Sequence, residues 1–224
     1  MRRKRRGRKG VLITFEGIEG SGKTTQLVRL AKLLREDGHR VVETREPGGT
    51  PFAERIRELL LSPTAEPIAP ECEAFLILAC RSQHLAHVIQ PALNEGAVVL
   101  CDRFSDSTLA YQGYARGLDV QLLRNLNRFA TGGLTPDLTL LFDVPVPLGL
   151  SRRQRHEMEQ NRLDRESRRF HVRVRQGFLE LAARYPRRIR VIDGSPDPET
   201  VAGEVVSIVR RFLQTRRKSK VRKS

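Results

Sequence analysis

The stretch VLITFEGIEGSGKTT at residues 11–25 restricts the possible folds of this chain more than any other feature. Its first half is an apolar run that predicts a buried strand. Its second half, GIEGSGKT, matches the phosphate-loop pattern G-x-x-x-x-G-K-[ST] at every fixed position. Glycines in such a loop let backbone N–H groups surround a phosphate, and the helix that follows directs the positive end of its dipole at the same group. The alternative is a glycine-rich turn, but an amphipathic run directly after the motif supplies the context that a phosphate loop requires.

The fixed positions of the motif predict distinct roles. Lys23 adds a positive charge between terminal phosphates, and the hydroxyl of Thr24 can bind Mg²⁺. We therefore predict that the chain binds the phosphates of a nucleotide through Gly17, Ile18, Glu19, Gly20, Ser21, Gly22, Lys23 and Thr24.

A second pair of charged residues follows another apolar run. Residues 97–101 predict a buried strand that delivers Asp102 and Arg103 at its carboxyl end, where open α/β sheets hold their ligands. A carboxylate at this position suits metal binding, and an arginine offers a bidentate fork to a second phosphate. The alternative is a local ion pair. It is disfavoured because an unused charge at the end of a core strand is costly to desolvate.

Strand-like and helix-like segments alternate along the chain. This order predicts an α/β fold, specifically a doubly wound P-loop fold with a five-stranded parallel sheet flanked by helices. The expected strands are 11–15, 41–44, 97–101, 138–144 and 189–192. After the helix that follows the phosphate loop, the expected helices are 51–60, 70–94, 109–114, 120–130, 170–185 and 198–213.

The net charge of +15 is concentrated at the two ends. Residues 1–10 hold seven Lys/Arg and residues 214–224 hold six, with no acidic residue in either; removing these thirteen from 41 leaves 28 basic against 26 acidic side chains. We expect both ends to be disordered tails, either solvated without a partner or in weak, salt-sensitive contact with nucleic acid or anionic surfaces. Residues 11–213 are expected to form a single domain.

Apolar runs and cysteines indicate the compartment. No apolar run approaches the ~20 residues of a membrane span, and no signal-peptide core follows the N-terminal charges. Cys72, Cys80 and Cys101 are odd in number and lie in apolar surroundings. We therefore expect buried free thiols in a reducing, cytoplasmic compartment rather than a disulfide or a zinc site.

Over residues 11 to about 213 the chain resembles the thymidylate kinases, which transfer a phosphoryl group from ATP to dTMP. The stretch at 101–119 together with TREPGG makes the resemblance highly specific. The segments that carry it are FEGIEGSGKTT at 15–25, TREPGGTPFAERIRELLL at 44–61, CRSQH at 80–84, CDRFSDSTLAYQGYARGLD at 101–119, PDLTLLFDV at 136–144 and FHVRVRQGFLELA at 170–182.

The resemblance implies an acceptor site opposite the phosphate loop. It places Glu19 near the sugar and phosphate of the acceptor, and it implies that Arg45 and Arg103 bind the acceptor phosphate. It also implies that Arg81, helped by Thr108, hydrogen-bonds the thymine edge. Asp102, with Thr24, is implied to place the Mg²⁺ ion that accompanies ATP.

The base pocket departs from the family pattern at one position. The resemblance implies that Tyr111 packs against C2′ of the deoxyribose, the alternative being an ordinary core tyrosine. Four residues before Arg81 the family usually has a phenylalanine, whereas this chain has Ile77 there and Phe75 two residues earlier. Because residues four apart share a helix face and residues six apart do not, we expect Ile77 to cover the base and Phe75 to lie in the core. The departure leaves a kinase of another monophosphate, such as dUMP, as the alternative.

The loop carries no arginine between its glycines, and in this family such a loop goes with basic residues supplied by a mobile lid. Residues of about 151–166 are the expected lid, with Arg152, Arg153, Arg155 and Arg162 as candidates. We predict that Arg153 and Arg155 act with Lys23, Asp102 and Arg103 in catalysis, where an arginine stabilises charge on the moving phosphoryl oxygens. A solvated basic face is the alternative for each lid arginine.

The predicted function is therefore ATP- and Mg²⁺-dependent phosphorylation of dTMP. The resemblance implies a homodimer, with the helix at 70–94 as a plausible part of its interface. A P-loop ATPase that acts on nucleic acid through the basic tails is a third interpretation. It is disfavoured because the body is nearly neutral and aromatic residues are few.

Overall fold

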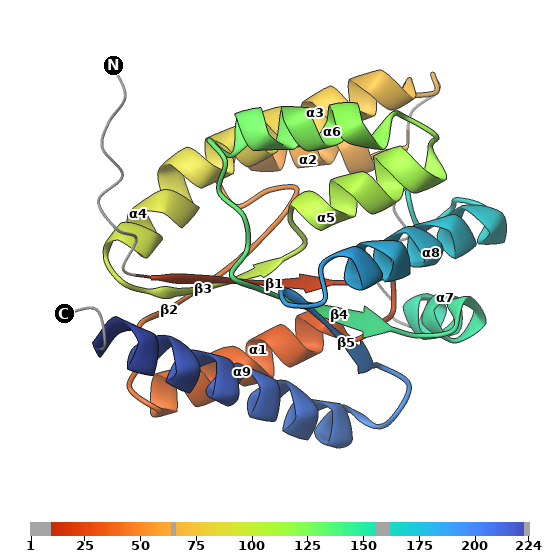
Figure 1. Ribbon diagram of the computed structural model, residues 1–224. Helices are drawn as coiled ribbons and strands as arrows, with labels where there is room; N and C mark the ends of the chain where they lie inside the picture. The colour runs from red at the N-terminus through yellow and green to blue at the C-terminus, as the bar shows by residue number, and fades with distance from the viewer. Residues whose placement is uncertain (1–9, 64–65, 156–161, 222–224) are drawn as a thin grey trace, which may run out of the picture.

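The computed structural model describes residues 10–63, 66–155 and 162–221, with side chains up to residue 216. The five strands of the described residues are parallel, as predicted from the alternation of elements, and the structure places them in the order β2-β3-β1-β4-β5 (Figure 1). They are β1 Val11–Glu16, β2 Val41–Arg45, β3 Val98–Asp102, β4 Leu138–Asp143 and β5 Ile189–Asp193.

Helices cover both faces of this sheet (Figure 1). Two of them, α1 Lys23–Glu36 and α9 Pro198–Val221, lie on one face. The helices of the other face include α2 Pro51–Leu61, α3 Pro70–His84, η1 Leu85–Ile89, α4 Gln90–Asn94, α5 Ser105–Thr108, η2 Leu109–Ala115, α6 Val120–Ala130 and α8 Arg168–Arg184. A further helix, α7 Val146–Arg155, follows β4.

Strand β1 shows how the three layers are held together. Its side chains alternate between the two faces, as the pleat requires. Ile13 and Phe15 point into the cluster formed with α1 and α9, and the ring of Phe15 stacks on Phe142 at 5.9 Å between centroids. Leu12 points into the opposite cluster, formed with η1, α4 and β3. The strand that precedes the phosphate loop is therefore fixed from both sides.

The predicted long helix at 70–94 is continuous but not uniform. Residues 85–89 are wound as a π-helix between two α-helical parts, and residues 109–115 form a second π-helical segment. The helical character of both regions is confirmed. Apolar spacing predicts a helix but does not distinguish π from α winding, because the two differ only in which carbonyl each N–H contacts.

Three predictions outside the site are wrong. Cys72 is exposed, although Cys80 and Cys101 are buried and all three thiols are free. Phe75 is 61% exposed rather than in the core. The tail predicted to begin at residue 214 continues α9 as far as Val221.

Contacts of Arg216 explain part of the extra helix. Its Nη1 donates to Asp137 Oδ1 at 2.7 Å and its Nη2 donates to the Gly10 carbonyl at 3.0 Å, so the last turns of α9 are tied to the start of β1. Of the predicted tail at 1–10, residue Gly10 is instead buried and donates its N–H to the Leu93 carbonyl at 2.8 Å, and residues 1–9, like 222–224, lie outside the described residues. Within the described part of the chain, every helix is too short or too polar to cross a lipid bilayer.

Candidate active site

The phosphate loop joins the end of β1 to the start of α1, and its glycines are required by geometry. Gly17, Gly20 and Gly22 have φ of 142°, 68° and 87°, a region that side chains other than glycine rarely adopt. A Cβ on Gly20 would also lie 1.9 Å from the carbonyl oxygen of Gly149. The loop is therefore packed directly against α7, the helix that carries the candidate lid arginines.

Lys23 lies at the start of α1 with its ammonium turned back into the loop. Its Nζ donates to the Ile18 carbonyl at 3.1 Å, and only 8% of the residue is exposed. Burial, followed by the positive charge of Arg103, lowers the pKa of Lys23, and the carboxylates of Asp102 and Glu19 partly offset this, so that the pKa is about 8. A phosphate anion beside this ammonium would favour its charged form.

Thr24 and Asp102 come together although they lie on different elements. The Thr24 hydroxyl donates to Asp102 Oδ2 at 2.5 Å, because β3 runs beside β1 and both end at the same edge. A hydroxyl and a carboxylate are the hard oxygen ligands that Mg²⁺ prefers, and this ion usually takes only one or two protein ligands beside phosphate oxygens and water. The pair therefore fits the metal that the sequence predicts.

Arg103 leaves the end of β3 in an unusual backbone conformation. Its φ is 68°, the only positive φ among non-glycine residues of the described chain. The guanidinium turns toward the phosphate loop, where Nη1 donates to the Gly17 carbonyl and Nη2 donates to Glu19 Oε1, each at 2.9 Å. Burial acts to lower the pKa of Arg103, but the neighbouring Tyr111 and Glu19 raise it overall. The structure thus brings the two predicted anion sites into direct contact.

Glu19 of the phosphate loop is contacted by Arg103, Tyr111 and His171. The hydroxyl of Tyr111 donates to Glu19 Oε1 at 2.6 Å, and the Arg103 guanidinium carbon lies 4.9 Å from the centre of the Tyr111 ring. Burial acts to raise the pKa of Glu19, but the charge of Arg103 and contacts with His171 and Tyr111 lower it below its ordinary value. Tyr111 also packs edge-on against two aromatic rings of α8, so it is both a core residue and a site residue.

His171 was missed by the sequence analysis. It is fully buried on α8, and its Nδ1 lies 3.2 Å from Glu19 Oε2. Neither ring nitrogen makes a well-aligned hydrogen bond, and neither does Glu19 Oε2. A histidine next to an aromatic residue on an amphipathic helix looks like a core position, so the sequence offers little signal for it.

Arg45 ends β2 at the same edge, and Arg57 is a second residue that the sequence analysis missed. Arg45 Nη2 donates to Glu54 Oε2 at 3.1 Å, and Arg57 Nη1 donates to the Pro47 carbonyl at 2.7 Å. Burial lowers the pKa of Arg57, and the charges of Arg45 and Arg103 lower it further. Three guanidiniums therefore act on one region. Arg57 could have been found, because it falls on the inner face of α2, one turn from the fully buried Ala53.

Arg81 is almost fully buried, with 1% of its surface exposed. Its Nε donates to Glu46 Oε2 at 2.6 Å, and its Nη1 contacts both Thr108 Oγ1, at 2.7 Å, and Asn127 Oδ1. The predicted pairing of Arg81 with Thr108 in space is present, and its role toward a base stays a prediction. Glu46 also lies 3.0 Å from His84 Nδ1, and the peptide bond from Glu46 to Pro47 is cis.

Ile77 lies one turn before Arg81 on α3, as predicted. It is half-buried and packs against an apolar cluster between α2 and α3 that contains Ala53, Ile56, Leu60 and Cys80. Whether it covers a base stays a prediction. The error on Phe75 has a physical origin: α3 has an outer apolar face as well as an inner one, and spacing alone assigns both to the core.

The candidate lid arginines have different surroundings. Arg152 donates to the carbonyls of Gly194 and Ser195, at 2.6 and 2.7 Å, so it fastens the end of β5. Arg153 makes a bidentate ion pair with Asp164, with distances of 3.1 and 2.7 Å. Arg155 is exposed at the end of α7. The predicted lid residues 156–161 lie outside the described residues.

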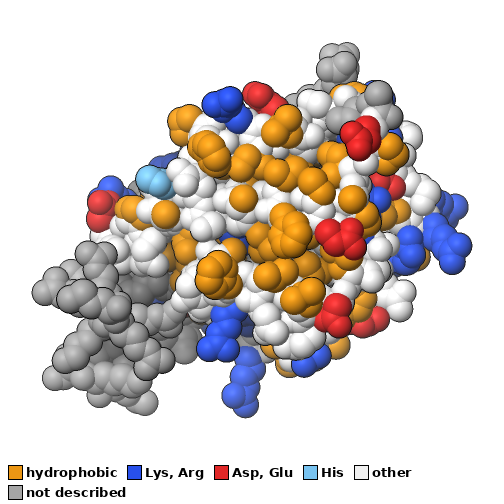
Figure 2. All heavy atoms as spheres, turned by 90° about the horizontal axis from the view of Figure 1, so that it is seen from above, with side chains coloured by type: hydrophobic (Ala, Val, Ile, Leu, Met, Phe, Trp, Pro, Cys, Tyr) orange, Lys and Arg blue, Asp and Glu red, His pale blue; other side chains and the backbone are white. Residues whose placement is uncertain are grey.

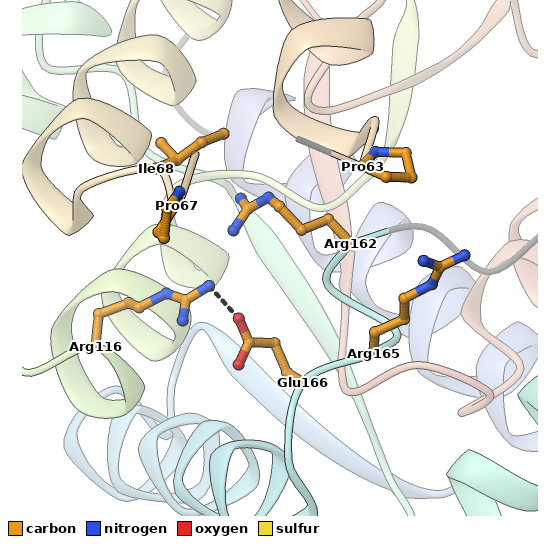
Figure 3. A pocket seen from close by; sticks show the side chains of 7 residues that line it. All are labelled: Pro63, Pro67, Ile68, Arg116, Arg162, Arg165 and Glu166. Atoms are coloured by element: carbon orange, nitrogen blue, oxygen red, sulfur yellow. Dashed lines mark hydrogen bonds and ion pairs between the residues drawn. The ribbon is translucent and has the colours of Figure 1, made fainter. Parts of the chain in front are cut away.

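A cavity of about 350 Å³ lies where the lid segment returns to the body. Figure 3 shows two prolines and Ile68 on one side, and charged side chains that include Arg116 and Glu166 on the other. The cavity is lined by the candidate lid residue Arg162 but by none of the residues predicted to bind ATP or dTMP. It therefore marks the attachment of the lid rather than the phosphate sites.

Fold and site together define a class of protein: a P-loop nucleotide-binding enzyme with an arginine from the end of a neighbouring strand beside its loop. The family model for thymidylate kinase matches residues 15–205, and the chain belongs to this family. It is 53% identical over 205 residues to a thymidylate kinase of Geobacter sulfurreducens, a match that covers 89% of this chain and 96% of the relative. It is 52% identical over 207 residues to that of Thermomicrobium roseum, covering 92% and 98%.

A crystal structure of thymidylate kinase from Ehrlichia chaffeensis superposes with a TM-score of 0.73 at 37% sequence identity, covering 89% of this chain and 98% of that one. The predicted family and fold are confirmed. The roles of individual residues are not tested by these likenesses.

Proposed function

We propose that this chain transfers the γ-phosphoryl group of ATP to dTMP, giving dTDP and ADP. The observation that carries the proposal is that Arg103, at the end of β3, bonds Gly17 and Glu19 of the phosphate loop, so that the predicted acceptor arginine lies beside the predicted ATP site. The names of relatives that are half identical over nearly their whole length support dTMP as the acceptor. A kinase of dUMP and a nucleic-acid-stimulated ATPase are not favoured by the same likenesses.

The donor side is formed by the loop and α1. Backbone N–H groups of residues 17–24 surround the phosphates of ATP, and Lys23 supplies a positive charge at the transferred group. Thr24 and Asp102 would hold Mg²⁺, which neutralises charge on the phosphates when bound. The close packing of Gly20 against Gly149 fixes the loop relative to α7.

The acceptor side is formed by the strand ends and α3. Arg103, Arg45 and Arg57 bind the acceptor phosphate, and Glu19 and Tyr111 contact the sugar. Arg81, Thr108 and Ile77 contact the thymine base. Because Glu19 already bonds Arg103, the acceptor has to share or replace that contact when it enters.

The transfer itself needs no covalent enzyme intermediate. An oxygen of the dTMP phosphate attacks the γ-phosphorus, and the bond from that phosphorus to the oxygen bridging to the β-phosphate breaks, so that ADP leaves with the bond electrons. Fixed positive groups stabilise the charge on the moving oxygens. We assign this role to Lys23, to Arg103 and to Arg153 of the lid.

A panel assay tests the proposed substrate. ATP consumption is measured in a coupled assay with dTMP, dUMP, dCMP, dAMP and dGMP in turn. We expect dTMP to give the highest kcat/KM, with dUMP lower because it lacks the methyl group that fills the pocket, worth about tenfold for one such group. Equal rates with dTMP and dUMP would contradict the assignment of the base pocket, and stimulation by DNA alone would replace the proposal.

A second copy of the chain is the proposed partner. Figure 2 views the molecule from the side of α2, α3 and α6, where hydrophobic side chains gather on the surface. The exposed ones on these helices are Phe52, Leu59, Phe75, Leu122 and Phe129. An apolar face of this kind is typical of a protein interface. Analytical ultracentrifugation should find a dimer that Phe75→Asp weakens, whereas Val28→Asp on α1, which is 55% exposed, should leave it intact.

We further propose a cytoplasmic location, since the three thiols are free and the reaction consumes ATP. Weak contact with nucleic acid through the basic ends also stays a proposal, because most of those residues lie outside the described ones.

A further inference from the structure

Glu73 on α3 is a buried carboxylate that has no part in the proposed ATP and dTMP sites but accepts four hydrogen bonds. Its side chain is 1% exposed. Its Oε1 accepts from Gln112 Nε2 at 2.8 Å and from Arg116 Nε at 3.2 Å, and its Oε2 accepts from Arg116 Nη2 at 3.2 Å and from Arg162 Nη2. Burial acts to raise the pKa of Glu73, but the hydrogen bonds from Arg116 and Arg162 lower it, so the group is charged.

Arg162 and Arg116, the two arginines that contact Glu73, also hold residues 162–166 of the lid in place. Arg162 also bonds the end of α2: its backbone N–H donates to the Leu61 carbonyl at 3.0 Å and its Nε donates to the Leu60 carbonyl at 2.9 Å. Four residues on, Glu166 accepts from Arg116 Nη2 at 2.6 Å, the contact drawn in Figure 3. Residues 162–166 are therefore held at both ends by charges that meet at Glu73 and Arg116.

Between those two attachments lies Asp164, whose side chain is 2% exposed and pairs with both nitrogens of one edge of the Arg153 guanidinium. The backbone of Arg153 is close to the phosphate loop, because a Cβ on Gly20 would lie 3.2 Å from its nitrogen. A continuous set of contacts thus leads from Glu73, through Arg162 and Asp164, to Arg153 beside the loop.

We propose that Glu73 is a positioning residue for phosphoryl transfer. It acts through Arg162 and Asp164 to hold the guanidinium of Arg153 at the donor phosphates, and the inference rests on the proposed role of Arg153. Glu73, Ile77 and Arg81 are four residues apart and share one face of α3. The helix that lies against the acceptor base therefore also orients an arginine on the donor side.

These contacts border the cavity of Figure 3, which is open to solvent. Arg165, which lines this cavity, is exposed. The attachment depends on charge rather than on apolar burial, so a change of charge at Glu73 should release the lid without unfolding the sheet. Glu73→Gln removes the charge and keeps the shape of the side chain. Glu95→Gln is the matched control, because Glu95 forms an ion pair with Arg40 at the opposite edge of the sheet.

Two measurements on the full chain test the proposal. The first is the rate at which trypsin cleaves after Arg152, Arg153, Arg155 and Arg162, followed by mass spectrometry without nucleotide. The second is steady-state kinetics with ATP and dTMP, with the melting temperature measured alongside. For Glu73→Gln we expect cleavage in the lid about tenfold faster and kcat about tenfold lower, with KM for dTMP within about twofold of the parent. Asp164→Asn should lower kcat to a similar extent.

The opposite results decide against the inference. Lid cleavage and kcat within about twofold of the parent in a folded Glu73→Gln protein would overturn it, as would a loss that appears only in the melting temperature. If Glu73→Gln does not fold, Arg162→Met, which removes the contact from the lid side, is held to the same criteria. A parent chain inactive on dTMP would refute the proposed function instead, and the cleavage rates would still show whether Glu73 holds the lid.

Discussion

The phosphate loop and the lid segment are both proposed to place positive charge at the transferred group, and they are fixed by different forces. The loop is held by backbone geometry: glycines at positive φ, a strand buried on both faces, and contacts too close for a Cβ. The lid residues 162–166 are held mainly by ion pairs, together with two hydrogen bonds from Arg162 to carbonyls of α2. Backbone packing does not change when a charge is removed, whereas an ion pair is lost when one of its partners is neutralised. We therefore expect charge-removing substitutions to loosen the lid segment and to leave the phosphate loop in place.

The largest effect is expected on the side of the phosphate loop. Arg103→Ala should lower kcat/KM for dTMP by about 10³-fold, because a buried guanidinium that binds the acceptor phosphate cannot be replaced by water. Binding of ATP, measured by calorimetry, should change little. Near-normal turnover of this variant would show that the acceptor site has been misassigned.

The lid should give the next largest effect, and only at one of its arginines. Arg153→Met should lower kcat by about 10²-fold, since it removes a charge held next to the loop. Arg155→Met is the matched control, and we expect a much smaller loss because Arg155 is exposed at the end of α7. Equal losses in steady-state assays of the two variants would mean that the contacts of Arg153 in this structure do not select the acting residue.

The fit between the two regions can be tested at Gly20. Gly20→Ala introduces a Cβ that meets the Gly149 carbonyl and should weaken ATP binding by about 30-fold, as a cost of about 2 kcal/mol implies. The control is Gly38→Ala, where φ is also positive, 80°, but no atom lies within 4 Å of the new Cβ. It should lower the melting temperature slightly and leave the ATP affinity unchanged. Equal ATP affinities in the two variants would show that the contact of Gly20 with α7 does not shape the phosphate loop.

The smallest effect concerns pH. The pKa of Lys23 is lowered to about 8, mainly by burial, so the free enzyme loses this charge as pH rises through that value. Because the protonated form binds phosphate, kcat/KM for ATP should fall above about pH 8 and approach tenfold per pH unit, since this ratio reports the free enzyme. At saturating ATP the fall in kcat should move to higher pH, because bound phosphates favour the ammonium. A flat profile from pH 7 to 9.5 would contradict the lowered pKa.

The same contrast explains what could be predicted from the sequence. Strand runs, the phosphate-loop glycines and the strand-end pair Asp102–Arg103 are local patterns, and parallel strands bring their carboxyl ends together, so these predictions transferred to the structure. Helix spacing places Arg57 on the inner face of α2 but does not name the charges that it meets, and His171 and Glu73 could not be identified at all. Each occupies an inward position on an amphipathic helix, where spacing predicts burial but not which distant charge the side chain will meet. Tertiary pairing, not periodicity, decides such positions.

Arg103 carries one more implication, for engineering. Its left-handed backbone suits glycine, but a glycine there would leave the largely buried carboxylate of Glu19 without its ion-pair partner, and that loss outweighs the backbone strain relieved. A stabilisation strategy that replaces every positive-φ residue with glycine would therefore lower the melting temperature at this position. Thermostable variants of this enzyme should be sought with position 103 held constant.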